Sequence, residues 1–349
     1  MDDTARAKSP IHYVHGERLP APGGTIEVAP GVHWLRMPLP FALNHINLWM
    51  VRDGDGWAMV DCGIARDDTK ALWKQVWVAT LMGRRVTRLI VTHFHPDHMG
   101  LAAWHCAEWG IEMWCTQGEY TMARAMRVIG SEPNDNAARD EFYRRHGVSA
   151  EQLTLLAKRG NHYPGAVLPL PGAYRRIEGG ETLRIGAHDW RIIIGTGHAP
   201  EHACLYCADL GVLISGDQVL PRITTNVSVW PTEPEANPLA KYLGSLDLFR
   251  PLPADTLVLP SHDRPFTGLH GRLDMLKAHH DERLGRVVES CKAGALTAAE
   301  LIPTLFPGRT LDAHQMGFAL GESLSHLRYL ESLGRVRRET EGDVVRFAA

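Results

Sequence analysis

Apolar and polar residues along the first part of the chain follow patterns that predict strands and helices in turn. Residues 25–62 hold β-branched and apolar runs, broken by Pro-Gly and by the turn at 53–56, which is typical of short strands. Residues 67–82 and 98–109 show helical spacing, and the continuous apolar run at 86–93 predicts a buried strand. This order of elements predicts an α/β layered domain.

The pattern becomes helical over 117–163, where few strand signals occur among many charged residues. We expect two or three helices there, inserted between core strands. Short strand-like runs return over 176–216, and the run at 255–263 predicts one more strand that ends in a loop. The strand-rich parts together predict a sheet packed on a sheet, with helices outside.

The chain after residue 265 has a different pattern. Apolar residues at helical spacing predict a long amphipathic helix over 269–291 and further helices over 296–306 and 312–333. A Glu-Gly-Asp turn then predicts a hairpin, and three helices followed by a hairpin are the layout of a small winged-helix module. We therefore predict a catalytic domain over 1–265, with the insertion at 117–163, and a winged-helix-like domain over 266–349.

The composition narrows the classes of function. The 349 residues include 37 Lys plus Arg and 40 Asp plus Glu, and this balance argues against a protein that grips nucleic acid or an anionic membrane by bulk charge. The amino-terminal residues lack the apolar core of a signal peptide, and no apolar run approaches the ~18 residues of a membrane span. Six Cys are too few for a disulfide scaffold, so we expect a cytoplasmic protein without a membrane partner.

The 19 His residues are the unusual feature of the composition, and they are densest in one short motif. His93 and His95 alternate by two, so their imidazoles project to the same side of an extended segment. Pro96 ends that segment and places Asp97 and His98 at the turn that follows. Imidazole and carboxylate groups suit zinc, and also iron or manganese. Further metal-capable residues follow later strand-like runs, namely His198, Asp217 and His262.

Together with Asp61 in Val-Asp-Cys-Gly, these residues resemble the metallo-β-lactamase-fold hydrolase superfamily, whose characteristic motifs appear in order between residues 25 and 266. The resemblance implies an αβ/βα sandwich and two divalent metal ions, with zinc as the first choice. It implies that one ion takes His93, His95 and His198, and that the second takes Asp97, His98 and His262. Asp217 would bridge the two ions, and Asp61 would orient ligands or metal-bound water. The tail resembles that of a subgroup with a C-terminal winged-helix module.

A dinuclear site of this kind implies hydrolysis by a metal-bridging hydroxide. Asp61, Asp97 and Asp217 are the candidate catalytic carboxylates, and Asp97 or a nearby His is the candidate proton shuttle. No serine nucleophile is needed, and the sequence contains no Gly-x-Ser-x-Gly motif. Candidate substrate-binding residues are Asn226, Trp230 and His280, whereas His202 is expected to be structural.

The substrate stays open at this point. We expect a small-molecule ester, thioester or lactone, because the charge is nearly balanced and the insertion is rich in Met. Gln218-Val219-Leu220 follows the bridging Asp where lactonases of the superfamily commonly carry Tyr, which weakens a strict lactonase assignment. The alternative is an endoribonuclease-like phosphodiesterase that uses a basic hairpin at Arg335, Arg337 and Arg338. An iron flavoprotein of this fold would need a flavin domain, which the tail does not provide. A homodimer stays open.

Overall fold

Two mixed β-sheets form the centre of the computed structural model, which describes residues 10–41, 43–131 and 133–349. Residues 1–9, on which the expectation about a signal peptide depends, lie outside the described residues. The first sheet has the strand order β2-β3-β4-β5-β6-β7-β8, with the bounds Ile26–Ala29, Val32–Pro38, His45–Asp53, Gly56–Val60, Val86–Ile90, Met113–Cys115 and Arg175–Arg176.

The second sheet has the strand order β1-β14-β13-β12-β11-β10-β9, with the bounds His12–Tyr13, Phe266–Thr267, Leu257–Pro260, Val212–Gly216, His202–Cys207, His188–Gly195 and Thr182–Ile185. In the first sheet the strands β5, β6, β7 and β8 run parallel to one another, and in the second sheet β12 is parallel to β13. The carboxyl ends of these strands therefore lie at the same edge of their sheets.

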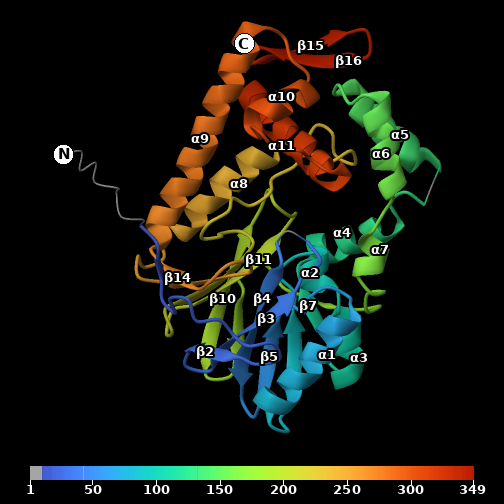
Figure 1. Ribbon diagram of the computed structural model, residues 1–349. Coiled ribbons are helices and arrows are strands. Elements are labelled where there is room, and N and C mark those ends of the chain that lie inside the picture. The colour runs from blue at the N-terminus through green and yellow to red at the C-terminus, as the bar shows by residue number, and fades with distance from the viewer. Residues whose placement is uncertain (1–9, 42, 132) are drawn as a thin grey trace.

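The two sheets pack face to face, and helices cover both outer faces (Figure 1). Strand β4 shows how the sequence specifies this arrangement. Ile46, Leu48 and Met50 belong to the core under the helices, whereas Trp49 and Val51 belong to the core between the sheets. Successive side chains of a strand point to opposite faces, so a strand covered on both faces is apolar along its whole length.

Helices α1 (Asp67–Val76), α3 (Ala102–Trp109) and α4 (Gln117–Val128) cover the first sheet. Helices α8 (Pro238–Leu246) and α9 (Leu269–Ala293) cover the second sheet. Helix, sheet, sheet and helix layers in this order form an αβ/βα sandwich, so the predicted fold class is confirmed.

The inserted segment contains α4, α5 (Pro133–Arg145), α6 (Ala150–Arg159) and the one-turn helix α7 (Tyr163–Ala166). The expectation of two or three helices over 117–163 is confirmed by α4, α5 and α6, and α7 begins at the last residue of that range. Helix α4 packs on the first sheet, whereas Phe142, Val148 and Leu156 of the following segment join the core of the C-terminal helices. The segment therefore connects the sandwich to the C-terminal region (Figure 1).

The C-terminal region follows the predicted order of elements. Helices α9, α10 (Ala298–Leu305) and α11 (Ala313–Ser332) precede the hairpin of β15 (Arg337–Glu341) and β16 (Val344–Ala348). One apolar core runs from Leu213 and Val258 in the second sheet to Leu301 and Leu320 in α10 and α11. Because this core is continuous, the division into independent domains near residue 265 stays a prediction, and so does the winged-helix character of the tail.

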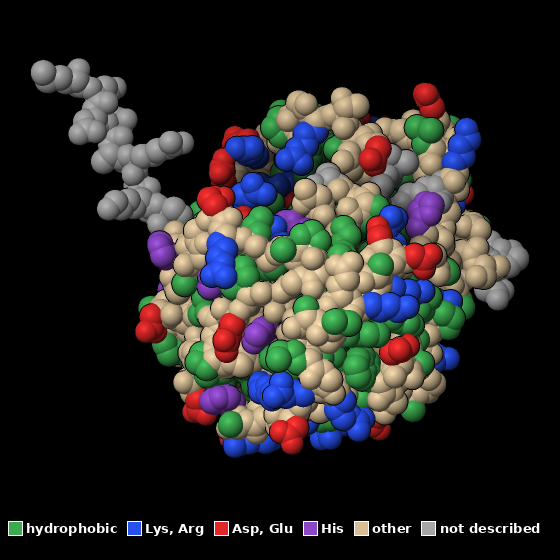
Figure 2. Space-filling view, turned by 60° about the horizontal axis from the view of Figure 1, so that its bottom comes forward, with side chains coloured by type: hydrophobic (Ala, Val, Ile, Leu, Met, Phe, Trp, Pro, Cys, Tyr) green, Lys and Arg blue, Asp and Glu red, His purple; other side chains and the backbone are tan. Residues whose placement is uncertain are grey.

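Within the described residues, no helix combines the length and the apolar character that a membrane span needs. The surface in Figure 2 shows basic and acidic side chains interspersed on the face that it presents. All six cysteines are free, as their number led us to expect.

Candidate metal centre

The predicted metal ligands lie where strands of both sheets end, on the side of the sandwich nearest the C-terminal helices (Figure 1). His93 follows β6, and α2 (Pro96–Met99) begins directly after His95. His198 follows β10, Asp217 follows β12 and His262 follows β13, and these residues supply the rest of the cluster. Pro96 occupies the first helical position, where its missing N–H costs no hydrogen bond.

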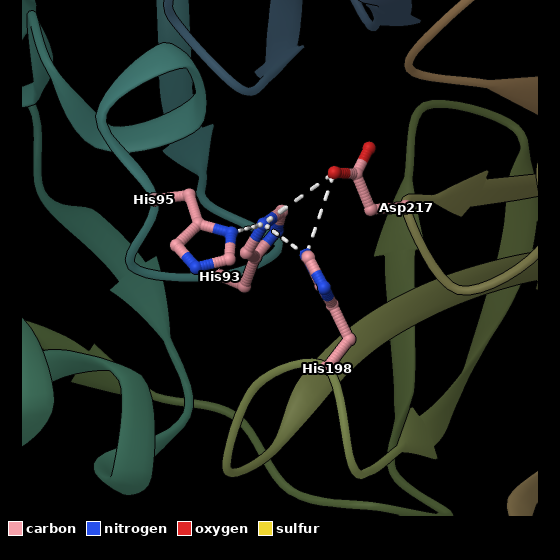
Figure 3. A group of neighbouring side chains, drawn as sticks. All are labelled: His93, His95, His198 and Asp217. Carbon is pink, nitrogen blue, oxygen red and sulfur yellow. Dashed lines mark hydrogen bonds and ion pairs between the residues drawn. The ribbon is translucent and has the colours of Figure 1, made fainter. Parts of the chain in front are cut away.

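The first cluster contains His93, His95, His198 and Asp217, whose candidate ligand atoms lie within 4.8 Å of one another. Nε2 of His93 is 2.9 Å from Nδ1 of His95 and 3.2 Å from Nε2 of His198. One carboxylate oxygen of Asp217, Oδ2, is 3.4 Å from Nε2 of His198 and 4.0 Å from Nε2 of His93. The side chains converge from the two sheets on one point (Figure 3).

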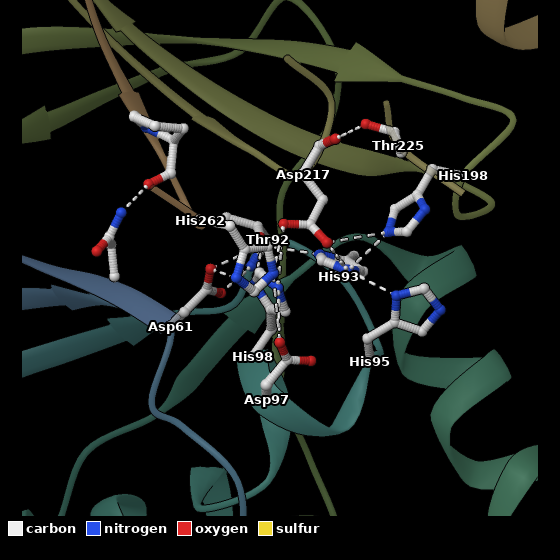
Figure 4. Close-up of polar contacts among 12 residues, drawn as sticks. Asp61, Thr92, His93, His95, Asp97, His98, His198, Asp217, Thr225 and His262 are labelled. Atoms are coloured by element: carbon white, nitrogen blue, oxygen red, sulfur yellow. Dashed lines mark hydrogen bonds and ion pairs between the residues drawn. The ribbon is translucent and has the colours of Figure 1, made fainter. Parts of the chain in front are cut away.

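The second cluster contains Asp97, His98 and His262, again with candidate ligand atoms within 4.8 Å of one another. Oδ2 of Asp97 is 3.8 Å from Nε2 of His98 and 3.6 Å from Nε2 of His262. The other oxygen of Asp217, Oδ1, is 3.6 Å from Nε2 of His98 and 3.4 Å from Nε2 of His262. Asp217 therefore turns one oxygen to each cluster (Figure 4).

These residues fit divalent metal ions. Donor atoms around a tetrahedral ion with bonds of ~2.1 Å lie about 3.4 Å apart, close to the separations found here. Nε2 of His98 and Oδ1 of Asp217 are buried without a hydrogen-bond partner in the part of the chain that the structure describes. A buried polar atom without a partner is costly, and a metal ion at this point would satisfy both atoms.

Hydrogen bonds to the opposite ring nitrogens orient the histidines. Nδ1 of His198 lies 2.8 Å from the carbonyl oxygen of Asn226, and Nδ1 of His262 lies 2.9 Å from that of His45. A proton on Nδ1 leaves Nε2 unprotonated toward the cluster, which is the form that binds a metal. His95 differs, because it presents Nδ1 to the cluster.

Asp61 lies directly behind the second cluster, and its side chain is almost fully buried. Its Oδ2 is 2.7 Å from Nδ1 of His98, and its carboxylate also accepts hydrogen bonds from the backbone N–H and the hydroxyl of Thr92, at 2.7 and 2.8 Å. The residue has φ 62°, a left-handed conformation that Asp tolerates better than most residues. The structure thus places Asp61 where it can orient a ligand, as the resemblance implies.

Burial and neighbouring charges set the protonation of the cluster. Burial, together with the surrounding imidazoles, lowers the pKa of His93 and His95, which favours the neutral form that a metal requires. Burial also opposes protonation of His98, but the carboxylates of Asp61, Asp97 and Asp217 outweigh it and raise the pKa of His98. A divalent cation would supply the positive charge that these carboxylates favour.

Residues outside the ligand set hold the ligand loops in place, and of these His202 was expected from the sequence whereas Glu119 was not. Nε2 of His202, expected to be structural, accepts the backbone N–H of Asp217 at 3.0 Å. Glu119 is fully buried and accepts the backbone N–H groups of Phe94 and Glu201. Burial raises the pKa of Glu119 to about 8. No local pattern distinguishes Glu119 from the other polar residues of an amphipathic helix.

The three candidate substrate residues lie in different places. The backbone of Asn226 holds His198, and its side chain reaches Glu322 of α11 at 3.5 Å. Trp230 is 37% exposed and packs edge-on against Phe318 of α11. His280 does not reach the clusters. It is buried between α9 and α11, where its Nδ1 lies 3.3 Å from His326.

Comparisons with known proteins agree with this geometry. Residues 43–262 match the Metallo-beta-lactamase superfamily, and residues 284–349 match a metallo-beta-lactamase-like C-terminal domain. A beta-lactamase domain protein from Burkholderia ambifaria is 46% identical, with 97% of each chain covered and a TM-score of 0.89. A metallo-beta-lactamase family protein from Thermus thermophilus is 28% identical, covers 92% of this chain and 99% of its own, and has a TM-score of 0.77.

Two curated relatives are more distant. A probable metallo-hydrolase of Bacillus subtilis is 23% identical over 90% of this chain and 96% of its own length. An atrochrysone carboxyl ACP thioesterase of Aspergillus fumigatus is 22% identical over 86% of this chain, which spans 60% of that protein. The chain belongs to the metallo-beta-lactamase superfamily and is a metal-dependent hydrolase of that superfamily.

Proposed function

We propose that the protein is a dinuclear-metal hydrolase of a small-molecule ester, thioester or lactone, with zinc as the metal. The observation that carries the proposal is the carboxylate of Asp217, whose two oxygens each face one histidine cluster. A carboxylate that faces two ligand sets in this way is suited to bridge two ions. When bound, a pair of divalent ions activates water near neutral pH and polarises the bond under attack.

The residues of the chain then have distinct tasks. His93, His95 and His198 would hold one ion, Asp97, His98 and His262 would hold the other, and Asp217 would contribute one oxygen to each set. Asp61 keeps the ring of His98 in place through Nδ1. The side chain of Asp97 is 17% exposed, against 11% for Asp217 and 2% for Asp61. Asp97 is therefore the carboxylate best placed to pass a proton to the leaving group.

A cavity beside α11 supports a small acyl substrate. The cavity has a volume of about 430 Å³, and its walls combine the apolar residues Phe306, Leu311, Phe318 and Ala319 with the polar residues Arg309, Thr310, Gln315 and Glu322. Its volume falls within the ~300–1,000 Å³ of ordinary ligand pockets. Glu322 lines the same cavity and contacts Asn226, whose carbonyl group holds His198.

The charges of the hairpin favour this proposal over a nucleic-acid substrate. Arg338 lies 2.8 Å from Glu235 and 3.2 Å from Glu331, and Arg337 lies 2.7 Å from Glu339. Basic residues that are paired with carboxylates on their own chain are poorly available for phosphates.

A substrate panel tests the proposed function. The zinc-loaded protein is assayed with p-nitrophenyl esters, acyl-CoA thioesters, lactones, bis-p-nitrophenyl phosphate and a short RNA. We expect turnover of at least one carbonyl substrate and loss of that turnover in the Asp217→Ala variant. Cleavage of the RNA or the phosphodiester without turnover of any carbonyl substrate would overturn the proposal in favour of the phosphodiesterase.

A further inference from the structure

The first turn of α4 lies against both loops that supply the three-histidine cluster. Oε2 of Glu119 accepts the backbone N–H of Phe94, the residue between His93 and His95, at 2.9 Å. Oε1 of the same carboxylate accepts the backbone N–H of Glu201 at 2.6 Å, in the loop that carries His198. One side chain from the inserted segment thus joins two loops that come from different sheets.

The contact with the second loop is reciprocal. The carboxylate of Glu201 accepts the backbone N–H of Gly118 at 2.7 Å, and the carbonyl group of Glu201 accepts the hydroxyl of Thr116 at 2.9 Å. A side chain at position 118 would bring its Cβ to 3.0 Å from the carboxylate of Glu201. Helix α4 and the His198 loop therefore fix each other at several points rather than through a single bond.

The His93–His95 loop is also held at two points, both of them backbone groups of Phe94. The carbonyl oxygen of Phe94 accepts the hydroxyl of Tyr163 at 2.6 Å, so both backbone groups of Phe94 are bound by the inserted segment. The ring of Phe94 is nearly buried and lies 6.3 Å from that of Tyr163. The peptide between the two histidine ligands is therefore fixed by residues that are not ligands themselves.

Burial makes these contacts costly to change. Glu119 has no exposed surface, and within the described residues no Lys or Arg forms an ion pair with it. A buried carboxyl group without a cation depends on hydrogen-bond donors, and here the donors are the two loop amides. A change in the distance between the two loops would therefore weaken these hydrogen bonds.

We propose that Glu119 is a positioning residue, which sets the spacing between the His93–His95 loop and the His198 loop and so determines the affinity of the three-histidine ion. This inference rests on the proposed two-metal function. It gives the insertion a task in the metal centre, because α4 then pre-organises the three-histidine site.

The test uses variants that each keep one cluster. His262→Ala leaves the three-histidine site, and His198→Ala leaves the Asp97–His98 site. Glu119→Gln is added to each background, and zinc affinity is measured by competition with a chelator. The amide keeps the shape of the side chain but turns an N–H₂ group toward one backbone N–H. We expect affinity to fall about 10- to 100-fold in the His262→Ala background and to stay unchanged in the His198→Ala background.

Two controls separate positioning from a general loss of structure. Glu108→Gln changes an exposed glutamate of α3 and should leave both affinities unchanged. The d–d spectrum of the cobalt-loaded protein should change with Glu119→Gln and stay unchanged with Glu108→Gln. If Glu119→Gln does not fold, Tyr163→Phe decides, because it removes only the bond to the carbonyl group of Phe94 and should weaken the same ion several-fold.

The outcomes separate this inference from the proposed function. Equal loss at both sites, or no loss at either site in a folded variant, would overturn the role of Glu119. If Tyr163→Phe has to decide, the absence of any effect on the three-histidine ion would overturn it as well. A wild-type protein that binds fewer than two ions would instead overturn the proposed function.

Discussion

Nδ1 of His98 lies 2.7 Å from a carboxylate oxygen of Asp61, and this contact turns the opposite ring nitrogen toward Asp217, 3.6 Å away. Asp61 therefore acts on the second cluster through a histidine and not by direct contact. Its left-handed backbone, with φ 62°, brings the carboxylate behind the ring. The geometry explains why a residue outside the ligand set should control metal affinity.

The Asp61→Asn variant tests this relationship. Asn tolerates a positive φ, so the substitution changes the charge without straining the backbone. We expect the affinity of the Asp97–His98–His262 ion to fall about 10- to 100-fold, measured by chelator competition. Asp55→Asn, in an exposed turn, is the matched control and should bind both ions as tightly as the wild type. Wild-type affinity in Asp61→Asn would show that the contact does not matter.

Gly216→Ala should disturb the metal centre at the loop that carries Asp217. Gly216 has φ 53°, and a Cβ there would lie 2.4 Å from the ring of His202, which accepts the N–H of Asp217. Gly211, on the same hairpin, has φ 62° but no atom within 4 Å of such a Cβ. We expect Gly211→Ala to lose only about 1–2 kcal/mol of unfolding free energy, and Gly216→Ala to lose more stability together with bound metal. Equal effects on metal content would contradict this account.

A buried histidine outside the metal centre should make the protein sensitive to acid. His105 of α3 is fully buried beside the rings of Trp73 and Trp104, and burial lowers its pKa to about 3. The unfolded chain binds a proton below about pH 6.5 and the folded chain does not, so stability is present above that pH and falls below it. The cost at pH 5 is about 2 kcal/mol.

His105→Phe keeps an aromatic ring at this position and removes the titrating group. The free energy of unfolding, measured by denaturant titration at pH 7 and pH 5, should fall about 2 kcal/mol less in this variant than in the wild type. An identical fall in the two proteins would show that His105 is protonated in the folded state.

The Trp230→Ala variant tests whether the acyl group of the substrate lies beside Trp230. Trp230 is 37% exposed and packs on Phe318, which lines the cavity beside α11. For the ester series, we expect Trp230→Ala to raise KM several-fold for aromatic or long acyl groups and to leave KM for the acetyl ester unchanged. A change that is the same for every acyl group would place the acyl chain elsewhere.

The sequence predicted which candidate ligands lie together better than it predicted the residues that support them. His93, Asp217 and His262 each follow an apolar strand, and strand ends of one edge converge, so a local pattern carries information about the site. Glu119 was missed because its contacts with Phe94 and Glu201 depend on how α4 packs, and helical spacing does not report packing.

The same limit applies to longer-range features. Strands β1 and β14 have two residues each, which is too short for an alternating pattern. His280 was expected near the substrate because one face of its helix could look into the cleft, but the packing of α11 buries it against His326. The order of the C-terminal elements was predictable, whereas their shared core with Phe142 and Leu156 was not.

The most direct test of the central claim is the metal content of the wild type and of Asp217→Ala, measured by elemental analysis of protein purified without chelator. Because each oxygen of Asp217 faces one cluster, we predict about two ions per chain in the wild type. We predict at most one ion in the variant, with hydrolysis lost. Two ions and intact hydrolysis in Asp217→Ala would contradict the central claim.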